Sequence, residues 1–300
     1  EEGEISEYLG INVKRQEQRF TLTQGGLIDR VISATGLKDC KDNWTPAHIA
    51  PLGKDEHLPA FDEPWSYASV VGMLMYLANN SRPDIAFAVN QCARFTHNPR
   101  SSHAKAVKMI VRYLSKTRDE GLILEPSGSL SVDCQLDADF AGLWKRENDQ
   151  DPLCVKSRTG YVISIGGCPL TWTSKLQTEI ALSTMEAEYI ALSQSMRELL
   201  PIKRLVKEMS DKLGNSAPYK IRTLSTVFED NTGALGMAKS PKLTPRNRHI
   251  AVKYHFFRSH VQDGSIEVVK IDTKSQKADI FTKGLPRETF EVIRRLLMGW

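Results

Sequence analysis

The sequence lacks the features that define several large classes of protein. Its five cysteines are odd in number and include no CxxC pair, which argues against a disulfide framework and against a zinc site. No apolar run approaches the ~20 residues that a membrane span requires, and residues 1–4 are acidic without a signal-peptide pattern. We also find neither a tandem repeat nor a low-complexity stretch. We therefore expect an intracellular protein with reduced thiols and no membrane partner.

Length and charge leave the class of partner open. The 300 residues fit two domains, and a hydrophobic fraction of 41% suffices for ordinary buried cores. A net charge of +4 and an isoelectric point of about 8.7 permit nucleic-acid binding without arguing for it. Residues 7–13 read as a strand with no earlier strand to pair with, which suggests a chain cut from something longer.

The first part of the chain mixes short strands with helices. Residues 8–15 and 19–23 are typical of strands. Residues 23–35 favour a helix with Thr23 as its N-cap and Gly36 as its terminator.

Three more helices are predicted over residues 63–78, 83–95 and 101–116, and Pro83 suits the first turn of the middle one. The last of them carries four basic residues on one face: Lys105, Lys108, Arg112 and Lys116. This stripe is either a solvated face or a face that follows the phosphates of a nucleic acid.

A stretch with proline, serine and glycine, residues 119–130, predicts a domain boundary. The strands expected after it cover residues 130–137, 157–165, 169–174, 223–228 and 266–271. Gly166-Gly167 is a hairpin signal between the second and third of them. Helices are expected from Ser183, from Gly233 and from about Lys274, and Pro201 should kink or end the first.

Four acidic residues stand at or near the ends of these elements: Asp137, Glu188, Asp230 and Asp279. Glu188 shares a helix face with Met185 and Leu192, where a carboxylate is costly unless it is paired or binds a metal. Ser183 and Glu186 form a capping box, which gives Glu186 a structural task and leaves Glu188 for another.

Each aspartate also has a structural interpretation of its own. Asp137 could be an ordinary turn residue, and Asp230 could cap the N-terminus of the next helix. Asp279, in the first turn of the last helix, could interact favourably with the helix dipole. Taken together, the four carboxylates and the elements that carry them suit divalent cations, which bind carboxylate oxygen. The sequence therefore predicts a metal site.

Many stretches of the chain match one known family. In the second part these are residues 136–142, 157–162, 171–177, 183–192, 229–231, 248–250, 254–256 and 277–285. In the first part they are residues 8–10, 67–77, 82–89, 97–99 and 112–114. On these motifs nearly the whole chain resembles the Pol polyproteins of copia-type retrotransposons.

The resemblance implies an α/β fold in two domains. Residues 1–125 would be the end of a reverse-transcriptase palm and a mostly helical thumb and connection region, of α+β class. Residues 130–300 would be a ribonuclease H-like domain, a mixed five-stranded sheet flanked by helices. The family's metal-binding and catalytic carboxylates would fall on Asp137, Glu188, Asp230 and Asp279. Near-neighbour alternatives are Asp139, Glu186 and Glu229, and the pattern Glu-Tyr-Ile-Ala-Leu favours Glu188 over Glu186.

The implied activity is endonucleolytic hydrolysis of the RNA strand of RNA–DNA hybrids with two Mg²⁺ ions, or Mn²⁺ in their place. The implied partners are the hybrid and the rest of the Pol polyprotein, namely the reverse-transcriptase palm and fingers and the integrase. The implied location is a cytoplasmic virus-like particle, the nucleus or both. Two alternatives stay open: a non-catalytic nucleic-acid-binding remnant, and a structural subdomain of a reverse transcriptase.

The chain departs from the family pattern in two places. It has no Tyr-x-Asp-Asp turn, so we expect no DNA synthesis from this chain alone. Its loop at residues 272–274 lacks the histidine that many cellular ribonucleases H carry there. His249 and His255 either assist in its place or are packed or surface histidines.

A second basic run precedes the last strand: Lys242, Arg246, Arg248, His249, Lys253 and Arg258. It is either a solvated face or a surface for the hybrid backbone. With the earlier stripe, the residues expected to contact nucleic acid are Lys105, Lys108, Arg112, Lys116, Arg246, Arg248, His249 and Lys253. Asn231 and Gln194 are candidates for contacts with the 2′-hydroxyl of RNA.

Overall fold

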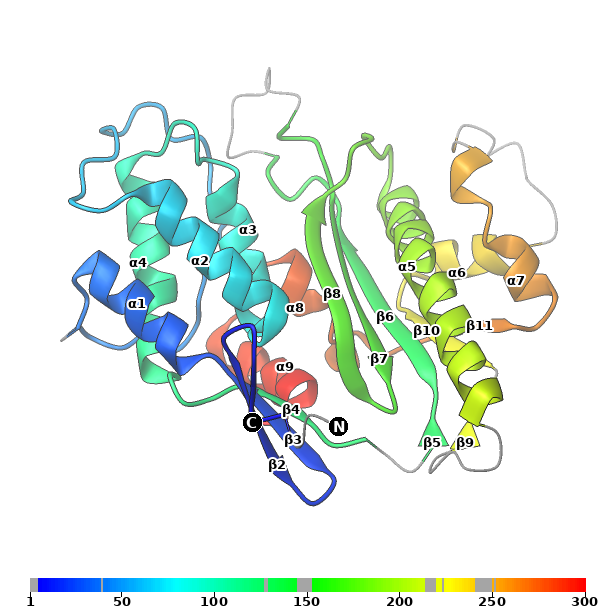
Figure 1. The fold of residues 1–300 in the computed structure, drawn as a ribbon. Helices are drawn as coiled ribbons and strands as arrows, with labels where there is room; N and C mark the ends of the chain where they lie inside the picture. The colour runs from blue at the N-terminus through cyan, green and yellow to red at the C-terminus, as the bar shows by residue number, and fades with distance from the viewer. Residues whose placement is uncertain are drawn as a thin grey trace. The chain divides into compact units, whose positions relative to one another are not determined.

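The computed structural model describes residues 5–38, 40–126, 129–144, 153–213, 220–222, 224–240, 250 and 252–300. The chain forms two compact units, which Figure 1 draws as a ribbon. The first unit comprises Glu1–Leu124, Leu143–Cys154 and Lys283–Trp300, and the second comprises Glu125–Gly142 and Val155–Thr282. The first long segment of the first unit ends at Leu124.

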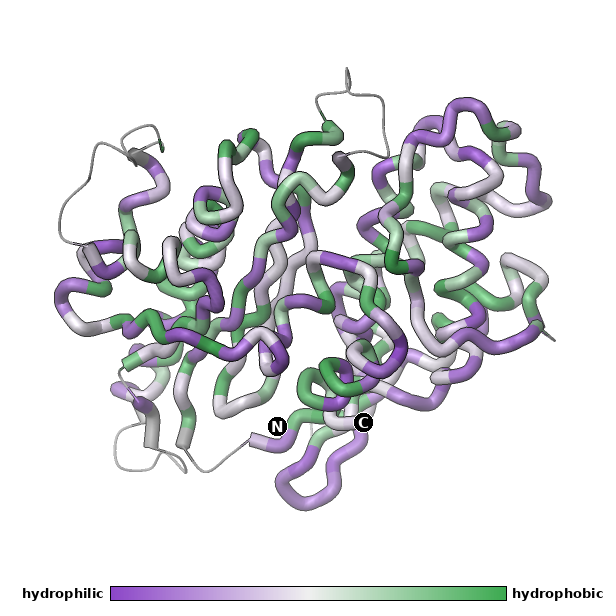
Figure 2. The backbone as a smooth tube through the Cα atoms, turned by 180° about the vertical axis from the view of Figure 1, so that it is seen from behind, coloured by the Kyte–Doolittle hydropathy of each residue, from purple (hydrophilic) through white to green (hydrophobic). Residues whose placement is uncertain are grey.

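An antiparallel sheet of short strands belongs to the first unit. Its order is β1 (Glu7–Tyr8), β2 (Ile11–Gln16), β3 (Arg19–Thr23) and β4 (Leu122–Leu124). The strand predicted over residues 19–23 is thus confirmed. The one predicted over residues 8–15 is interrupted, because Leu9 and Gly10 take positive φ in a turn that separates β1 from β2. The tip of the β2–β3 hairpin is hydrophilic (Figure 2).

The helix α1 (Gly25–Thr35) ends as the sequence predicts, but its N-cap lies one residue after the predicted one. Gly36 takes a left-handed φ of 69° at the C-cap, a conformation that glycine adopts at little cost. The N-cap is Gln24. The prediction of Thr23 as N-cap is wrong, because Thr23 is the last residue of β3 and pairs with Asn12.

Most of the first unit is helical, as expected. The helices α2 (Tyr67–Asn80), η1 (Pro83–Ile85), α3 (Ala86–Ala93) and α4 (Ser101–Lys116) follow one another, and α9 (Arg287–Met298) joins them. Pro83 begins η1, in agreement with its predicted place in a first turn. Apolar side chains that are at most 1% exposed form the core between them, among them Ile28, Val70, Leu74, Ile110 and Leu114.

A buried ion pair lies within this core. Arg82 is 1% exposed, and its Nε and Nη2 donate to the two carboxylate oxygens of Asp84 at 3.0 and 2.7 Å. Its Nη1 also donates to the carbonyl of Thr117, and the hydroxyl of Tyr113 donates to Asp84 at 2.6 Å. Buried charges are tolerated when they are paired and hydrogen-bonded in this way.

The C-terminal segment belongs to the first unit, whereas the predicted second domain ran to residue 300. Its contacts explain the difference. The ring of Phe290 packs edge-on against Tyr113, and the indole nitrogen of Trp300 donates to the carbonyl of Gly121 at 2.7 Å. The amphipathic α9 therefore buries its apolar face against helices from the first half of the chain.

The second unit contains a mixed five-stranded sheet of order β11-β10-β6-β7-β8. β6 (Val132–Asp139), β7 (Arg158–Ile165) and β8 (Cys168–Leu176) pair antiparallel in chain order. β10 (Ser225–Glu229) runs parallel to β6, and β11 (Ile266–Lys270) runs parallel to β10. The expected ribonuclease H-like sheet is confirmed. Gly166 and Gly167 form the predicted hairpin turn with φ of 57° and 84°.

Helices cover this sheet, also as expected. α5 (Thr184–Leu213) packs against β6 and β7, and Figure 1 shows it alongside the strands. It continues past Pro201, so that residue does not end the helix. α6 (Thr232–Lys239) packs against α5 and β11, and α8 (Asp279–Thr282) packs against β6, β7 and β8.

Short elements complete the second unit. They are β5 (Ser129–Leu130) paired with β9 (Lys220–Ile221), the turns η4 (Val252–Tyr254) and η5 (Thr273–Ser275), and α7 (Arg258–Gln262). Among the described residues, none of the helices combines the length and apolarity that a membrane span requires.

Candidate metal centre

Asp137 and Asp230 come together because the strands that carry them are parallel. Val227 of β10 pairs with Cys134 of β6, so three residues further along, at 230 and 137, the two aspartates stand level at the same edge of the sheet. Asp137 lies within β6 and is 4% exposed, and Asp230 directly follows β10. The register of the sheet therefore sets the first two carboxylates side by side.

Glu188 reaches the same place from the first turns of α5. Ser183 Oγ accepts from the Glu186 N–H at 3.2 Å, as the predicted capping box requires. The side chain of Glu186 differs from the prediction, because its Oε2 accepts from the N–H of Leu182, one residue before the cap, at 2.9 Å. Glu186 is therefore occupied at the cap. The side chain of Gln177 donates to the carbonyl of Ala187 at 2.8 Å, which ties the turn next to Glu188 to the sheet.

Asp230 does not cap α6. The N-cap is Asn231, whose Oδ1 accepts from the N–H groups of Gly233 and Ala234 at 2.9 and 3.0 Å. The structural interpretation of Asp230 as a cap is therefore wrong. The capping role also occupies the side-chain oxygen of Asn231, which was a candidate for contact with a 2′-hydroxyl.

The three carboxylates of Asp137, Glu188 and Asp230 converge. Each offers an oxygen, and these oxygens lie within 4.8 Å of one another. Asp137 and Glu188 are each 4% exposed, so water does little to reduce the repulsion between the negative charges. A divalent cation would offset that repulsion, and carboxylate oxygens are the ligands that Mg²⁺ and Mn²⁺ prefer.

Asp279, the fourth predicted ligand, is not in this group of three. It is the first residue of α8 and is 6% exposed. Its helix nevertheless packs on β6 beside Asp137, since Thr282 of the same helix donates a hydrogen bond to Asp137 Oδ2. Asp279 as a ligand stays a prediction.

The near-neighbour alternatives have other surroundings. The carboxylate of Asp139 is turned to Gly142, where an added Cβ would lie 1.7 Å from its Oδ2. Glu229 is fully buried at the end of β10, and its Oε1 accepts from the Asn231 N–H at 2.9 Å. Burial, together with the charges of Asp230 and Asp137, raises the pKa of Glu229 to about 8.

Glu229 also supports the fit of a cation at this place. Its Oε2 is buried and has no hydrogen-bond partner among the residues that the structure describes. A buried, unsatisfied carboxylate oxygen beside three converging carboxylates is unusual in a site built only for stability. The donor set is all oxygen and strongly negative, which suits a hard divalent ion.

The basic stripe on α4 is partly neutralised. Lys108 forms an ion pair with Glu63 at 2.6 Å. Lys116 lies 3.4 Å from Asp42 and 3.7 Å from the centre of the Trp44 ring. Lys105 is exposed and Arg112 is half-buried. A nucleic-acid role for the stripe stays a prediction.

The second basic run is described only in part. Lys242, Arg246, Arg248 and His249 lie outside the described residues. Lys253 pairs with Glu179 at 2.6 Å. Arg258 is largely buried and donates to the carbonyl of Ser240, which is a structural contact.

His255 is packed. Its Nδ1 forms a hydrogen bond of 2.8 Å with the hydroxyl of Tyr189. Burial, and then the charge of Arg258, lower the pKa of His255. These contacts support the structural interpretation of this histidine.

Two threonines at the site, Thr282 and Thr273, were not predicted from the sequence. The hydroxyl of Thr282 donates to Asp137, and the hydroxyl of Thr273 donates to Asp230 Oδ2 at 3.2 Å. Both stand in or near the motif of residues 277–285, but nothing in the sequence marks a threonine as a partner of a carboxylate 145 residues earlier.

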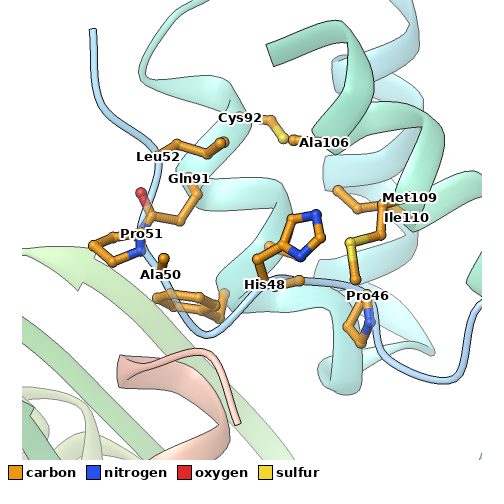
Figure 3. A pocket seen from close by; sticks show the side chains of 13 residues that line it. Pro46, His48, Ala50, Pro51, Leu52, Gln91, Cys92, Ala106, Met109 and Ile110 are labelled. Carbon is orange, nitrogen blue, oxygen red and sulfur yellow. The ribbon is translucent and has the colours of Figure 1, made fainter. Parts of the chain in front are cut away.

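Two pockets lie away from the carboxylates of the candidate metal centre. One, in the first unit, has a volume of about 20 Å³ and is lined in part by His48, Cys92 and Met109 (Figure 3). It has room for about one water molecule. The other, in the second unit, has a volume of about 330 Å³ and is lined in part by Lys203 and Arg222. None of the four predicted metal ligands lines either pocket.

Comparison with known proteins gives relatives over nearly the whole chain. The retrovirus-related Pol polyprotein from transposon RE1 of Arabidopsis thaliana is 34% identical over 288 residues, which is 96% of this chain and 18% of that protein. The corresponding polyprotein from transposon TNT 1-94 of Nicotiana tabacum is 35% identical over 303 residues, 98% of this chain and 22% of that protein. The chain thus spans about a fifth of the length of these curated relatives.

Comparison with family models and with solved structures gives weaker information than these relatives do. No family model matches the sequence. Among solved structures, the N-terminal RNase H domain of a Mycobacterium tuberculosis protein, fused to maltose-binding protein, is 13% identical with a TM-score of 0.32. The alignment covers 56% of this chain and 98% of that one.

The identities of 34% and 35% agree with the motifs found in both parts of the chain, and the strand order of the second unit agrees with the fold that those motifs imply. The chain belongs to the retrovirus-related Pol polyproteins of copia-type transposons and corresponds to a segment with a ribonuclease H-like domain.

Proposed function

We propose that this chain is a metal-dependent endonuclease that hydrolyses the RNA strand of RNA–DNA hybrids, as part of a retrotransposon reverse-transcriptase polyprotein. The observation that carries the proposal is the convergence of Asp137, Glu188 and Asp230 from a strand, a helix and a strand end to within 4.8 Å. Carboxylates that gather in this way, two of them buried and one half-buried, are typical of sites that bind divalent ions.

Asp137, Glu188 and Asp230 would hold the metal, with Asp279 as the proposed fourth ligand and two Mg²⁺ ions, or Mn²⁺, as the proposed cofactor. When bound, the ions supply an activated water and stabilise the charge on the scissile phosphate. The chain itself contributes the rigid placement of the ligands. Its strands and the capped start of α5 fix three carboxylates before any substrate arrives.

The hybrid would be held by basic residues. We propose Lys105, Lys108, Arg112, Lys116, Arg246, Arg248, His249 and Lys253 for this role. Lys108, Lys116 and Lys253 have acidic partners, so their contribution requires exchange of a carboxylate for a phosphate. Preference for RNA would come from contacts with the 2′-hydroxyl.

The remaining proposals follow from membership of the polyprotein. Residues 1–125 would be the end of a reverse-transcriptase palm with its thumb and connection region. Residues 130–300 would be the ribonuclease H-like domain, of which the last part, residues 283–300, packs in the first unit. The palm and fingers and the integrase would come from the rest of the polyprotein, in a cytoplasmic virus-like particle, the nucleus or both. DNA synthesis by this chain is not proposed, because the Tyr-x-Asp-Asp turn is absent from its sequence.

A cleavage assay tests the proposal. The full chain is incubated with a hybrid labelled on its RNA strand, with and without Mg²⁺. We expect cleavage that needs the metal and that is lost in Asp137→Asn and in Glu188→Gln. The matched control is Asp211→Asn, because Asp211 is an exposed carboxylate further along α5.

Two outcomes would overturn the proposal. If both site variants cut as fast as the parent, the carboxylates are not catalytic. If the parent binds the hybrid with Mg²⁺ and does not cut it, the chain is a non-catalytic remnant or a structural subdomain.

A further inference from the structure

The two aspartates of the site each accept a hydrogen bond from a threonine. Thr282 Oγ1 donates to Asp137 Oδ2, and Thr273 Oγ1 donates to Asp230 Oδ2 at 3.2 Å. Both threonines come from the segment after β11, whereas the aspartates lie on β6 and after β10. One short stretch of chain therefore contacts both carboxylates.

Thr282 is held firmly at its position. It is fully buried, and α8 packs onto the sheet at Gly160, where an added Cβ would lie 2.6 Å from Thr282 Cγ2. Upstream of α8, Gln276 Nε2 donates to the carbonyl of Leu136 at 2.7 Å, and the Lys277 N–H donates to the side chain of Gln135 at 2.8 Å. The chain before Thr282 is thus hydrogen-bonded to β6 immediately beside Asp137.

The Thr282 hydroxyl can serve only one acceptor at a time, because it has one hydrogen. Its oxygen lies 3.3 Å from the Asp279 carbonyl and is closer to Asp137 Oδ2. The shorter contact is to a charged group, and hydrogen bonds to carboxylates are the stronger kind. We therefore conclude that the Thr282 hydroxyl donates its hydrogen bond to Asp137.

Thr273 is held less firmly. It is exposed and begins η5, a single turn whose N-cap Asp272 accepts from the Lys274 N–H at 2.8 Å. The strand before it is tied to β10, since the Ile271 N–H donates to the Glu229 carbonyl at 3.1 Å. Its hydrogen bond to Asp230 is longer and reaches solvent, so its effect should be smaller.

We propose that Thr282, with a weaker contribution from Thr273, is a positioning residue that orients the aspartates of the site for metal binding. The hydroxyl engages one carboxylate oxygen and so restricts the rotation of the carboxyl group, which would set how that carboxylate is presented to an ion. Groups that hydrogen-bond to metal ligands in this way typically contribute about 10- to 100-fold to metal affinity. The inference rests on the proposed function, because it takes the carboxylates as metal ligands.

Metal binding by the full chain is the test, measured by calorimetric titration with Mn²⁺ and with Mg²⁺ in the absence of nucleic acid. We expect Thr282→Val, which keeps the shape and removes the hydroxyl, to weaken binding by about 10-fold or more. Thr282→Ser keeps the hydroxyl and should restore affinity to near that of the parent. The matched control is Thr171→Val, a threonine of β8 that is paired with Ile163.

A second variant covers the case in which Thr282→Val fails to fold. Thr273→Val alters an exposed side chain, so it should fold as the parent does and weaken binding only a few-fold. If Thr282→Val folds and binds the metal as tightly as the parent does, the inference is overturned. If Thr282→Val does not fold and Thr273→Val binds as tightly as the parent does, the inference is overturned as well.

The titration separates this inference from the proposed function. If the parent itself binds no metal, or if Asp137→Asn binds as well as the parent, the proposed metal site fails. If the parent binds, Asp137→Asn does not, and Thr282→Val binds like the parent, the metal site stands and the positioning role is wrong.

Discussion

Gly160 on β7 lies directly opposite Asp137 on β6, and α8 packs onto that glycine. The space for a side chain at Gly160 is taken by Thr282, Phe281 and Ala278. Because Gly160 has no side chain, α8 can approach the sheet closely enough for the Thr282 hydroxyl to reach Asp137.

Gly160→Ala should disturb the metal centre. The new Cβ would lie 2.6 Å from Thr282 Cγ2 and 2.8 Å from Phe281 Cβ, so α8 must move away from the sheet. We expect a loss of about 1–3 kcal/mol in the free energy of unfolding, measured with urea, as is usual for overpacking. Metal affinity should fall with it.

Gly236→Ala is the matched control for that substitution. Gly236 lies within α6, and a Cβ there would meet nothing within 4 Å. Because alanine favours a helix over glycine, stability should rise or stay the same, by up to about 1 kcal/mol. Equal effects of the two substitutions would contradict the packing argument.

Substitutions of the two glutamates in the first turns of α5, Glu186 and Glu188, should have different effects on hybrid cleavage. Glu186→Gln keeps an acceptor for the Leu182 N–H, so hybrid cleavage should stay within about threefold of the parent, under 1 kcal/mol of barrier. Glu188→Gln should abolish metal-dependent cleavage, because it removes a proposed ligand. Initial rates of hybrid cleavage measure both. The opposite result would make Glu186 the ligand in place of Glu188.

Breaking the buried ion pair of the first unit should be costly. Asp84→Asn leaves the Arg82 charge buried without its partner, so we expect a loss of about 3–5 kcal/mol in the free energy of unfolding. The matched control is Glu291→Gln, which breaks the exposed pair with Arg287 and should cost about 0.5 kcal/mol. Chemical unfolding monitored by circular dichroism measures both. If Asp84→Asn lowered the free energy of unfolding by no more than Glu291→Gln does, the argument that Arg82 needs its buried partner would be wrong.

His103 should make stability depend on pH. Its Nδ1 accepts from the Arg100 N–H at 2.8 Å, its Nε2 contacts the Gly53 carbonyl at 2.8 Å, and its ring stacks on Phe95. Burial lowers the pKa of His103 in the folded state, so the unfolded chain takes up the proton first as the pH falls.

The contribution of His103 is therefore complete above about pH 6.5 and is lost as the pH falls below it towards the folded-state pKa. Urea unfolding at a series of pH values from about 5 to 8 measures the slope. His103→Gln should reduce the slope below about pH 6.5, while replacement of the exposed His97 should leave it as it is. An unchanged slope in His103→Gln would assign the dependence to other groups.

Local chemistry made much of the fold predictable. The end of α1 at Gly36, the whole of α4, the Gly166-Gly167 turn and the capping interactions of Ser183 and Glu186 each depend on residues a few positions apart. Such features are encoded in backbone preferences and short-range hydrogen bonds. The same local rules misplaced two caps: the residue after Thr23 caps α1, and the residue after Asp230 caps α6.

The candidate ligands could be named from the sequence, because a carboxylate on an apolar helix face and motifs of known order identify Asp137, Glu188, Asp230 and Asp279 without coordinates. The convergence of Asp137, Glu188 and Asp230 could not be predicted in this way. The register of β10 against β6 brings Asp230 level with Asp137, the packing of α8 at Gly160 brings Thr282 to Asp137, and the packing of α9 assigns residues 283–300 to the first unit. These contacts join residues tens to more than a hundred positions apart, so they depend on how whole faces of strands and helices fit together rather than on any local preference.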